Sequence, residues 1–163
     1  MSALAAQVAK AFASDGPLAR SDPGFLPRDA PDRLALAIAQ AIDERSALVA
    51  EAGTGVGKTF AYLVPLLLSG RRALVSTATK SLQDQLFLRD LPRLAQALGV
   101  PVRMALLKGR ASYLCRHRLA LARDGAQLPD RFAVRALARV ETWAWRRRAA
   151  TWPRSTASTT ARR

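Results

Sequence analysis

A glycine-rich stretch of eight residues constrains this chain more than any other feature: Ala52-Gly53-Thr54-Gly55-Val56-Gly57-Lys58-Thr59. It fits the pattern of a phosphate-binding loop (Walker A), with Ala52 in the first glycine position. Backbone N–H groups of such a loop surround phosphate oxygens, and the helix that follows adds the positive end of its dipole. We therefore expect nucleotide binding. The residues expected to hold the phosphates are Gly53, Thr54, Gly55, Val56, Gly57, Lys58 and Thr59.

Short apolar runs alternate with helical patterns on both sides of this loop. The predicted strands are 47–50, 72–77 and 102–107. The predicted helices are 32–44, 58–69, 81–88 and 92–98, with Pro65 expected to kink the second. This alternation with short connections is typical of an α/β domain in which helices flank a parallel sheet.

The two ends of the chain differ from this central pattern. Residues 1–24 are predicted to be a polar, weakly helical lead-in that ends in breaker residues. Beyond residue 108 the sequence becomes rich in Ala, Arg and Leu, with helices predicted at 111–124 and 131–143. The stretch from 144 to 163 is predicted to be a disordered basic tail.

Charge and cysteine content narrow the function further. The chain has 163 residues and a net charge of +14, which indicates a polyanionic partner such as nucleic acid. Nine basic and two acidic residues lie between 103 and 139, so the excess is concentrated in the second half. One cysteine excludes an internal disulfide. No long apolar run is present, so we expect a soluble, cytoplasmic protein with no membrane partner.

A second motif lies at the end of the second predicted strand and the start of the next helix: Ser76-Thr77-Ala78-Thr79-Lys80-Ser81-Leu82-Gln83-Asp84-Gln85-Leu86. In open α/β sheets ligands bind beyond the carboxyl ends of the strands, which would include these hydroxyl and amide groups. Such groups suit contact with a sugar–phosphate backbone. The alternative is that Thr79 or Ser81 only caps the next helix while Gln83 and Gln85 face solvent.

Four segments in order resemble the start of the DinG/XPD-like superfamily 2 helicases, and most closely their DinG/YoaA branch. They are FLPR (25–28), EAGTGVGKT (51–59), STATKSLQDQL (76–86) and LLKGRASYLCRHRL (106–119). The resemblance implies an ATP-dependent 5′-3′ DNA helicase that acts on single-stranded DNA. Such proteins generally carry a [4Fe–4S] cluster.

The resemblance also implies a domain order and a set of site residues. Residues 25–108 would be part of the first RecA-like motor domain, and 109–143 the start of the helical iron–sulfur domain. The P-loop would bind ATP, with Thr59 as a ligand of Mg²⁺. Residues expected to contact DNA are Thr77, Thr79 and Gln83. Cys115 would be the first of four cluster ligands, although a lone cysteine is more often an inert thiol. His117 has no partner at metal-binding spacing, which favours a surface role.

Three features depart from the family pattern. Pro31 occupies the position where the family has a glutamine that recognises adenine. Three of the four cysteines are missing, so this chain cannot hold the cluster alone. An Asp-Glu-x-His box and a second motor domain are also absent from the sequence, and Glu141 stands in the wrong context to replace the box. We therefore expect nucleotide binding with negligible ATP hydrolysis.

Arg outnumbers Lys by 22 to 4, which indicates a GC-rich gene. One hypothesis is that the chain is a truncated or frameshifted helicase whose last ~20 residues are read out of frame. The alternative is a basic tail that binds nucleic acid. Two other functions stay open at this point: a small P-loop kinase with the 103–139 block as a lid, and a non-enzymatic nucleic-acid-binding protein.

Overall fold

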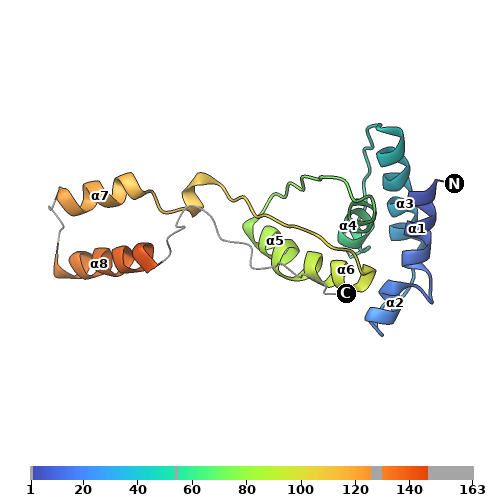
Figure 1. Ribbon diagram of the computed structural model, residues 1–163, viewed down its shortest axis with the longest axis horizontal. Coiled ribbons are helices and arrows are strands. Elements are labelled where there is room, and N and C mark those ends of the chain that lie inside the picture. The colour runs from blue at the N-terminus through green and yellow to red at the C-terminus, as the bar shows by residue number, and fades with distance from the viewer. Residues whose placement is uncertain (1, 54, 126–129, 147–163) are drawn as a thin grey trace. The chain divides into compact units, whose positions relative to one another are not determined.

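A computed structural model describes residues 2–53, 55–125 and 130–146, so predictions for 144–163 lie almost wholly outside the described residues. The chain divides into two compact units at Arg103 and Met104 (Figure 1). The first unit holds α1 (Ala3–Phe12), α2 (Pro17–Ser21), α3 (Asp29–Glu44), α4 (Lys58–Leu68), α5 (Lys80–Gln85), the π-helix η1 (Leu86–Asp90) and α6 (Leu91–Leu98). The second holds the 3₁₀-helix η2 (Arg110–Ser112), α7 (Arg116–Asp124) and α8 (Arg131–Arg146).

Helices α3 and α4 form the centre of the first unit. Both were predicted, and α3 begins three residues earlier than expected, at Asp29. Three alanines on these two helices, Ala35, Ala39 and Ala61, are fully buried, and the two helices pack on each other. Side chains this small let two helices approach closely and pack ridge into groove. The α3–α4 pair is therefore a rigid base for the loop that connects to the start of α4.

Residues 1–24, predicted to be a polar, weakly helical lead-in, are helical as expected, but their helices pack into the core. Helix α1 begins at an N-cap in which the Ser2 hydroxyl accepts the N–H of Ala5 at 3.1 Å. It buries one apolar face against α3 and α4, and Phe12 stacks at a tilt on Phe25 with ring centroids 6.3 Å apart. The buried residues that α1 and α2 contribute are Leu4, Val8, Ala11, Phe12 and Leu18. These helices are part of the core.

Residues 80–98 form one uninterrupted helical run, where two helices separated at 89–91 were predicted. Pro92 lacks an N–H and crowds the preceding turn, so a regular α-helix cannot continue through it. The chain responds by widening to a π-helix, in which the Leu91 N–H donates to the Leu86 carbonyl. Within this turn Asp90 is 4% exposed and accepts hydrogen bonds at 2.8 Å from Gln85 Nε2 and Arg89 Nε.

The three predicted strands are not paired within the described residues. Segments 46–50, 72–77 and 101–109 run as non-helical, extended chain without a strand ladder (Figure 1). A β-strand is stable only when a neighbouring strand satisfies its N–H and C=O groups. The parallel sheet therefore remains a prediction.

The second unit is a helical hairpin. Helix α7 begins at Arg116 instead of the predicted Ala111, because residues 110–112 form a short 3₁₀ turn. Helix α8 runs from Arg131 to Arg146, three residues beyond the predicted end, and contacts α7. Among the helices described, none has the length and apolar character needed to cross a membrane.

The packing of α1 leads to a stability prediction. Phe12 is 3% exposed, so Phe12→Ala leaves a cavity and should lower the free energy of unfolding by about 3–5 kcal/mol. Urea denaturation followed by circular dichroism measures this change. Gln7→Ala, on the exposed face of the same helix, is the matched control and should change it by less than about 0.5 kcal/mol. Equal effects of the two substitutions would contradict the packing of α1 in the core.

Candidate nucleotide-binding site

The phosphate-loop residues connect segment 46–52 to the first turn of α4. Gly55 has φ 79° and Gly57 has φ 81°, both in the left-handed region that favours glycine. Gly57 is the N-cap of α4, and its carbonyl accepts the N–H groups of Phe60 and Ala61 at 3.1 and 3.2 Å. The spacing of glycines in the sequence thus matches the positions where the backbone requires them.

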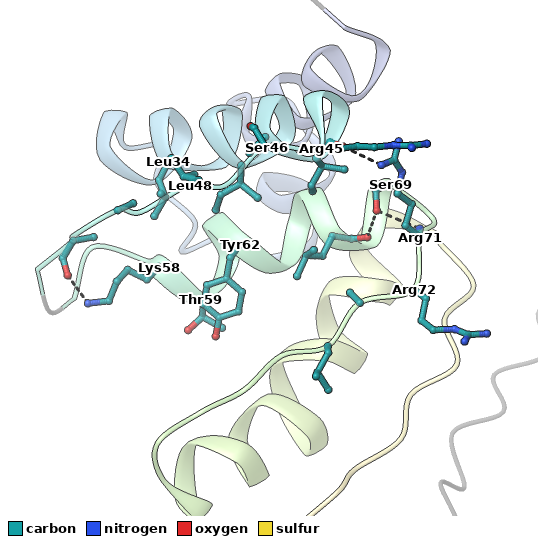
Figure 2. Close-up of a pocket in the computed structure, with 18 of the residues that line it drawn as sticks. Leu34, Arg45, Ser46, Leu48, Lys58, Thr59, Tyr62, Ser69, Arg71 and Arg72 are labelled. Atoms are coloured by element: carbon teal, nitrogen blue, oxygen red, sulfur yellow. Dashed lines mark hydrogen bonds between the residues drawn. The ribbon is translucent and has the colours of Figure 1, made fainter.

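Lys58 lies across the loop. Its Nζ donates to the Ala52 carbonyl at 2.5 Å, the bond drawn at Lys58 in Figure 2. It also donates to the Gly53 carbonyl at 2.9 Å. Its side chain therefore turns back from the first residue of α4 over the loop. This holds an exposed ammonium group beside the glycine backbone and the N-terminus of α4. A cation, a glycine-rich backbone and a helix N-terminus together suit a polyphosphate.

The start of α3 also contacts the loop. Arg28 Nη1 approaches the Gly55 carbonyl at 3.5 Å. Pro31 is buried and lies next to Gly57. A Cβ atom added to Gly57 would be 3.7 Å from the Cβ atom of Pro31. The residue that replaces the expected glutamine is therefore packed against the loop, and its ring offers no hydrogen-bond donor or acceptor to a nucleobase.

Thr59 and Tyr62 form a polar pair one turn into α4. Burial raises the pKa of the Tyr62 phenol above 10.0, and the nearby negative charge of Asp90 acts in the same direction. A side-chain hydrogen bond with Thr59 opposes these two effects only in part. Burial thus favours the neutral phenol of Tyr62, which lies beside Thr59, the residue expected to bind Mg²⁺.

A cavity of about 840 Å³ adjoins Lys58 and Thr59. Most of its wall is apolar and comes from α3, α4 and the two segments 46–50 and 71–74 (Figure 2). It reaches from the loop to the far ends of both helices, where Arg45 and Ser69 line it. Its chemistry suits aliphatic side chains more than a charged ligand.

The second motif lies at the start of α5. Thr79 is its N-cap, and the Thr79 hydroxyl accepts the Leu82 N–H at 3.2 Å, so the capping alternative is correct for this residue. Thr77 Oγ1 donates to the Thr79 carbonyl at 3.2 Å, which brings the two threonines together. Gln83 lies one turn further along and is half-buried, which contradicts the solvent-facing alternative.

Cys115 is exposed and precedes the first turn of α7, with no side-chain capping bond. His117 is exposed as well, in agreement with a surface role. Within the described ranges, no three His, Cys, Asp or Glu side chains gather as a metal site would require. A [4Fe–4S] cluster needs four thiolates, so the residues present do not fit one.

Comparisons with known proteins identify the family. The profile described as DEAD/DEAH box helicase matches residues 34–128, which is more than half of the chain. The chain belongs to this helicase family. It is similar to the ATP-dependent DNA helicase YoaA of Haemophilus influenzae, with 46% identity over 84% of this chain and 21% of that protein. It is also similar to the YoaA of Escherichia coli (51% identity, 72% of this chain, 19% of that protein).

More distant relatives include the ATP-dependent helicase DinG of Mycobacterium tuberculosis, 46% identical over 53% of this chain and 14% of that protein. The chain thus spans about a fifth of the length of the YoaA relatives it matches. No solved structure matches the chain. The family implies a RecA-like P-loop fold and the use of ATP and Mg²⁺, and it excludes the small-kinase interpretation.

Sequence reasoning missed two residues of the site. Arg28 appears in the sequence only as part of the FLPR segment. It approaches Gly55, which is 27 residues away in the sequence, and a local sequence pattern cannot predict a contact at that separation. Tyr62 was missed although its signal was present: it lies three residues after Thr59, which places both on one helix face.

Asp32, in the first turn of α3, leads to a prediction on pH. Its Oδ1 is buried without a hydrogen-bond partner among the described residues, and burial, then repulsion from Asp29, raises its pKa above 3.8. The folded state therefore binds this proton more tightly than the unfolded state does. This tighter proton binding by Asp32 stabilises the folded state fully below pH 3.8. The stabilisation is lost as the pH rises through the pKa that Asp32 has in the folded state.

Asp32→Asn should consequently raise the melting temperature at pH 7, and the gain should disappear below about pH 3.8. Thermal melts from pH 3 to pH 8 measure this. The control is Asp15→Asn, an exposed carboxylate outside α3 that does not act on Asp32, and it should give no gain. A gain at pH 7 that persists at pH 3 would show that charge is not the cause.

Proposed function

We propose that this chain is the N-terminal part of a DinG/YoaA-type, 5′-3′ ATP-dependent DNA helicase motor, which binds ATP–Mg²⁺ through its P-loop and single-stranded DNA through the motif that follows. The observation that carries the proposal is the position of Lys58, whose Nζ spans the loop carbonyls at 2.5 and 2.9 Å. The similarity to YoaA over 84% of the chain supports the same order of motifs.

On this proposal the loop binds the triphosphate through three groups. Backbone N–H groups at Gly53–Thr59 donate to phosphate oxygens, with the α4 dipole behind them. Lys58 exchanges its two carbonyl contacts for the β- and γ-phosphates, a stronger charge-assisted interaction. Thr59, which lies beside Tyr62, offers its hydroxyl to Mg²⁺.

Hydrolysis needs further groups. In P-loop enzymes carboxylates hold Mg²⁺ and the attacking water, and this sequence lacks the Asp-Glu-x-His box that supplies them in the family. We therefore propose that this chain alone binds ATP and turns it over negligibly. The helicase activity belongs to a complete motor, in which the [4Fe–4S] cluster would gain the ligands that Cys115 alone cannot supply.

The proposed DNA contacts are Thr77, Thr79 and Gln83. The first two are joined by the hydrogen bond from Thr77 Oγ1 to the Thr79 carbonyl, and Gln83 follows Thr79 at one helical turn. Lys80, exposed beside them, adds a positive charge. Such groups hold the phosphate backbone without distinguishing bases.

Substitution of Lys58 tests the nucleotide site. Lys58→Ala should weaken ATP–Mg²⁺ binding about 10- to 100-fold, because it removes charge-assisted hydrogen bonds worth about 1.5–3 kcal/mol. Isothermal titration calorimetry measures the affinity. Lys80→Ala, which removes an exposed lysine of the same unit away from the loop, should leave it unchanged. Wild-type affinity in Lys58→Ala would contradict the proposed site.

Substitution of Thr77 tests the DNA site. Thr77→Val keeps the shape of the side chain and removes its hydroxyl, so affinity for a single-stranded oligonucleotide should fall about 3- to 10-fold. The slope of log affinity against log salt should not change, because no charge is removed. Fluorescence anisotropy at several salt concentrations gives both values, with Ser76→Ala as the control. An unchanged affinity in Thr77→Val would count against this DNA site.

A further inference from the structure

The residues that lead into α3 contact the phosphate loop from outside it. Arg28 Nη1 lies 3.5 Å from the Gly55 carbonyl. The ring of Pro31 packs beside Gly57, with its Cγ atom 3.8 Å from the position of a Cβ atom added to that glycine. The loop holds only the phosphates, so the sugar and base of a bound nucleotide extend beyond it. Segment 28–31 is therefore a surface that can contact the base and select it.

Selection of one base requires two hydrogen-bonding groups fixed side by side. Adenine presents its N6 amino group as a donor next to N7 as an acceptor, and one carboxamide matches both. Guanine presents two acceptors, O6 and N7, which two N–H groups of one guanidinium match. A single donor does not distinguish the bases, because every base carries at least one acceptor.

The segments that meet at the loop contain no carboxamide. The sequence has no asparagine, and none of its six glutamines lies at 8–39 or 41–82. Gln40 follows Pro31 on α3 by nine residues, which is more than two helical turns. Its Nε2 donates to Glu44 Oε1 at 2.7 Å, so this amide already has a partner.

Pro31 is the residue of segment 28–31 that is fixed against the loop. It is buried in the first turn of α3, and its ring has neither a donor nor an acceptor. Arg28 and Asp29 are exposed; the first carries only donors and the second, when ionised, only acceptors. Among the described residues of this segment, no side chain thus holds a donor and an acceptor in one plane.

We propose that this site binds purine and pyrimidine nucleoside triphosphates with nearly equal affinity, because the residue fixed beside the loop, Pro31, cannot hydrogen-bond to a base. The phosphates supply the affinity through Lys58 and the loop backbone. The planar guanidinium of Arg28 stacks on the base, a contact that every base can make. The proposal deepens the proposed function and rests on it, since it names the nucleotides that the loop holds.

Isothermal titration calorimetry of this chain with ATP, GTP, CTP and UTP, each with Mg²⁺, tests the proposal. The four dissociation constants should agree within about threefold, because stacking and apolar contacts discriminate weakly. Inorganic tripolyphosphate, the probe without a base, should bind within about tenfold of them. A larger preference for any one base would overturn the proposal. If that base is guanine, the paired N–H groups of Arg28 read it.

Pro31→Gln places an amide beside Gly57 and gives a second readout. It should strengthen ATP binding about 5- to 10-fold through the added hydrogen bonds and leave the other three nucleotides within about twofold. Pro27→Gln makes the same exchange at an exposed position before α3, and this matched control should change no affinity.

An equal gain for all four nucleotides, or the same gain in Pro27→Gln, would contradict the role of Pro31. No gain in a Pro31→Gln variant that circular dichroism shows to be folded would contradict it as well. The comparison of the four nucleotides in the unsubstituted chain does not depend on this variant and decides by itself if the variant does not fold.

The outcomes separate this proposal from the proposed function. Binding of ATP with exclusion of the other three nucleotides would keep the proposed function and reject only the absence of base selection. Failure of every triphosphate to bind, tripolyphosphate included, would reject both. Similar binding of the four nucleotides that is weakened equally in Lys58→Ala would support both.

Discussion

The close contact between α3 and α4 is the constraint on which the nucleotide site depends. Ala35 and Ala39 on one helix and Ala61 on the other are fully buried, and side chains this small let two packed helices approach closely. Helix α4 starts at the phosphate loop and α3 starts at Pro31, which packs against Gly57. Fixing the two helices thus fixes both sides of the loop, even where strand pairing is absent from the described residues.

The sequence predicted those parts of the fold that local chemistry determines. The loop, α3 and α4 follow from glycine spacing, a helical apolar period and a Gly-Lys-Thr ending, and all three are present. The core contribution of α1 was missed although Leu4, Val8 and Ala11 recur at helical spacing after a Ser N-cap. Its many alanines and short length concealed an amphipathic face.

Other features could not be predicted from local patterns. The π-helix at Leu86–Asp90 arises because Pro92 must be accommodated within a packed helix, which depends on tertiary contacts. The segments predicted as strands, 47–50 and 72–77, have a clear apolar signal, but a strand is stable only beside a paired neighbour, and neither segment has one within the described residues. The approach of Arg28 to Gly55 is likewise a consequence of how α3 packs.

The groups around the loop suit the binding of ATP but not its hydrolysis. Lys58, Thr59 and the glycine backbone can neutralise and orient a triphosphate, and Tyr62 lies beside Thr59. The carboxylates that activate water belong to the box that this sequence lacks. We therefore expect this chain to bind ATP without hydrolysing it at a significant rate.

The proposed function depends on nucleotide binding by the backbone amides of the phosphate loop. Hydrogen exchange of residues 55–59, measured with and without ATP–Mg²⁺, tests this most directly. We expect slower exchange at these amides when nucleotide is added, with no change in α7 around Arg116. Unchanged exchange at 55–59 under saturating nucleotide would contradict it.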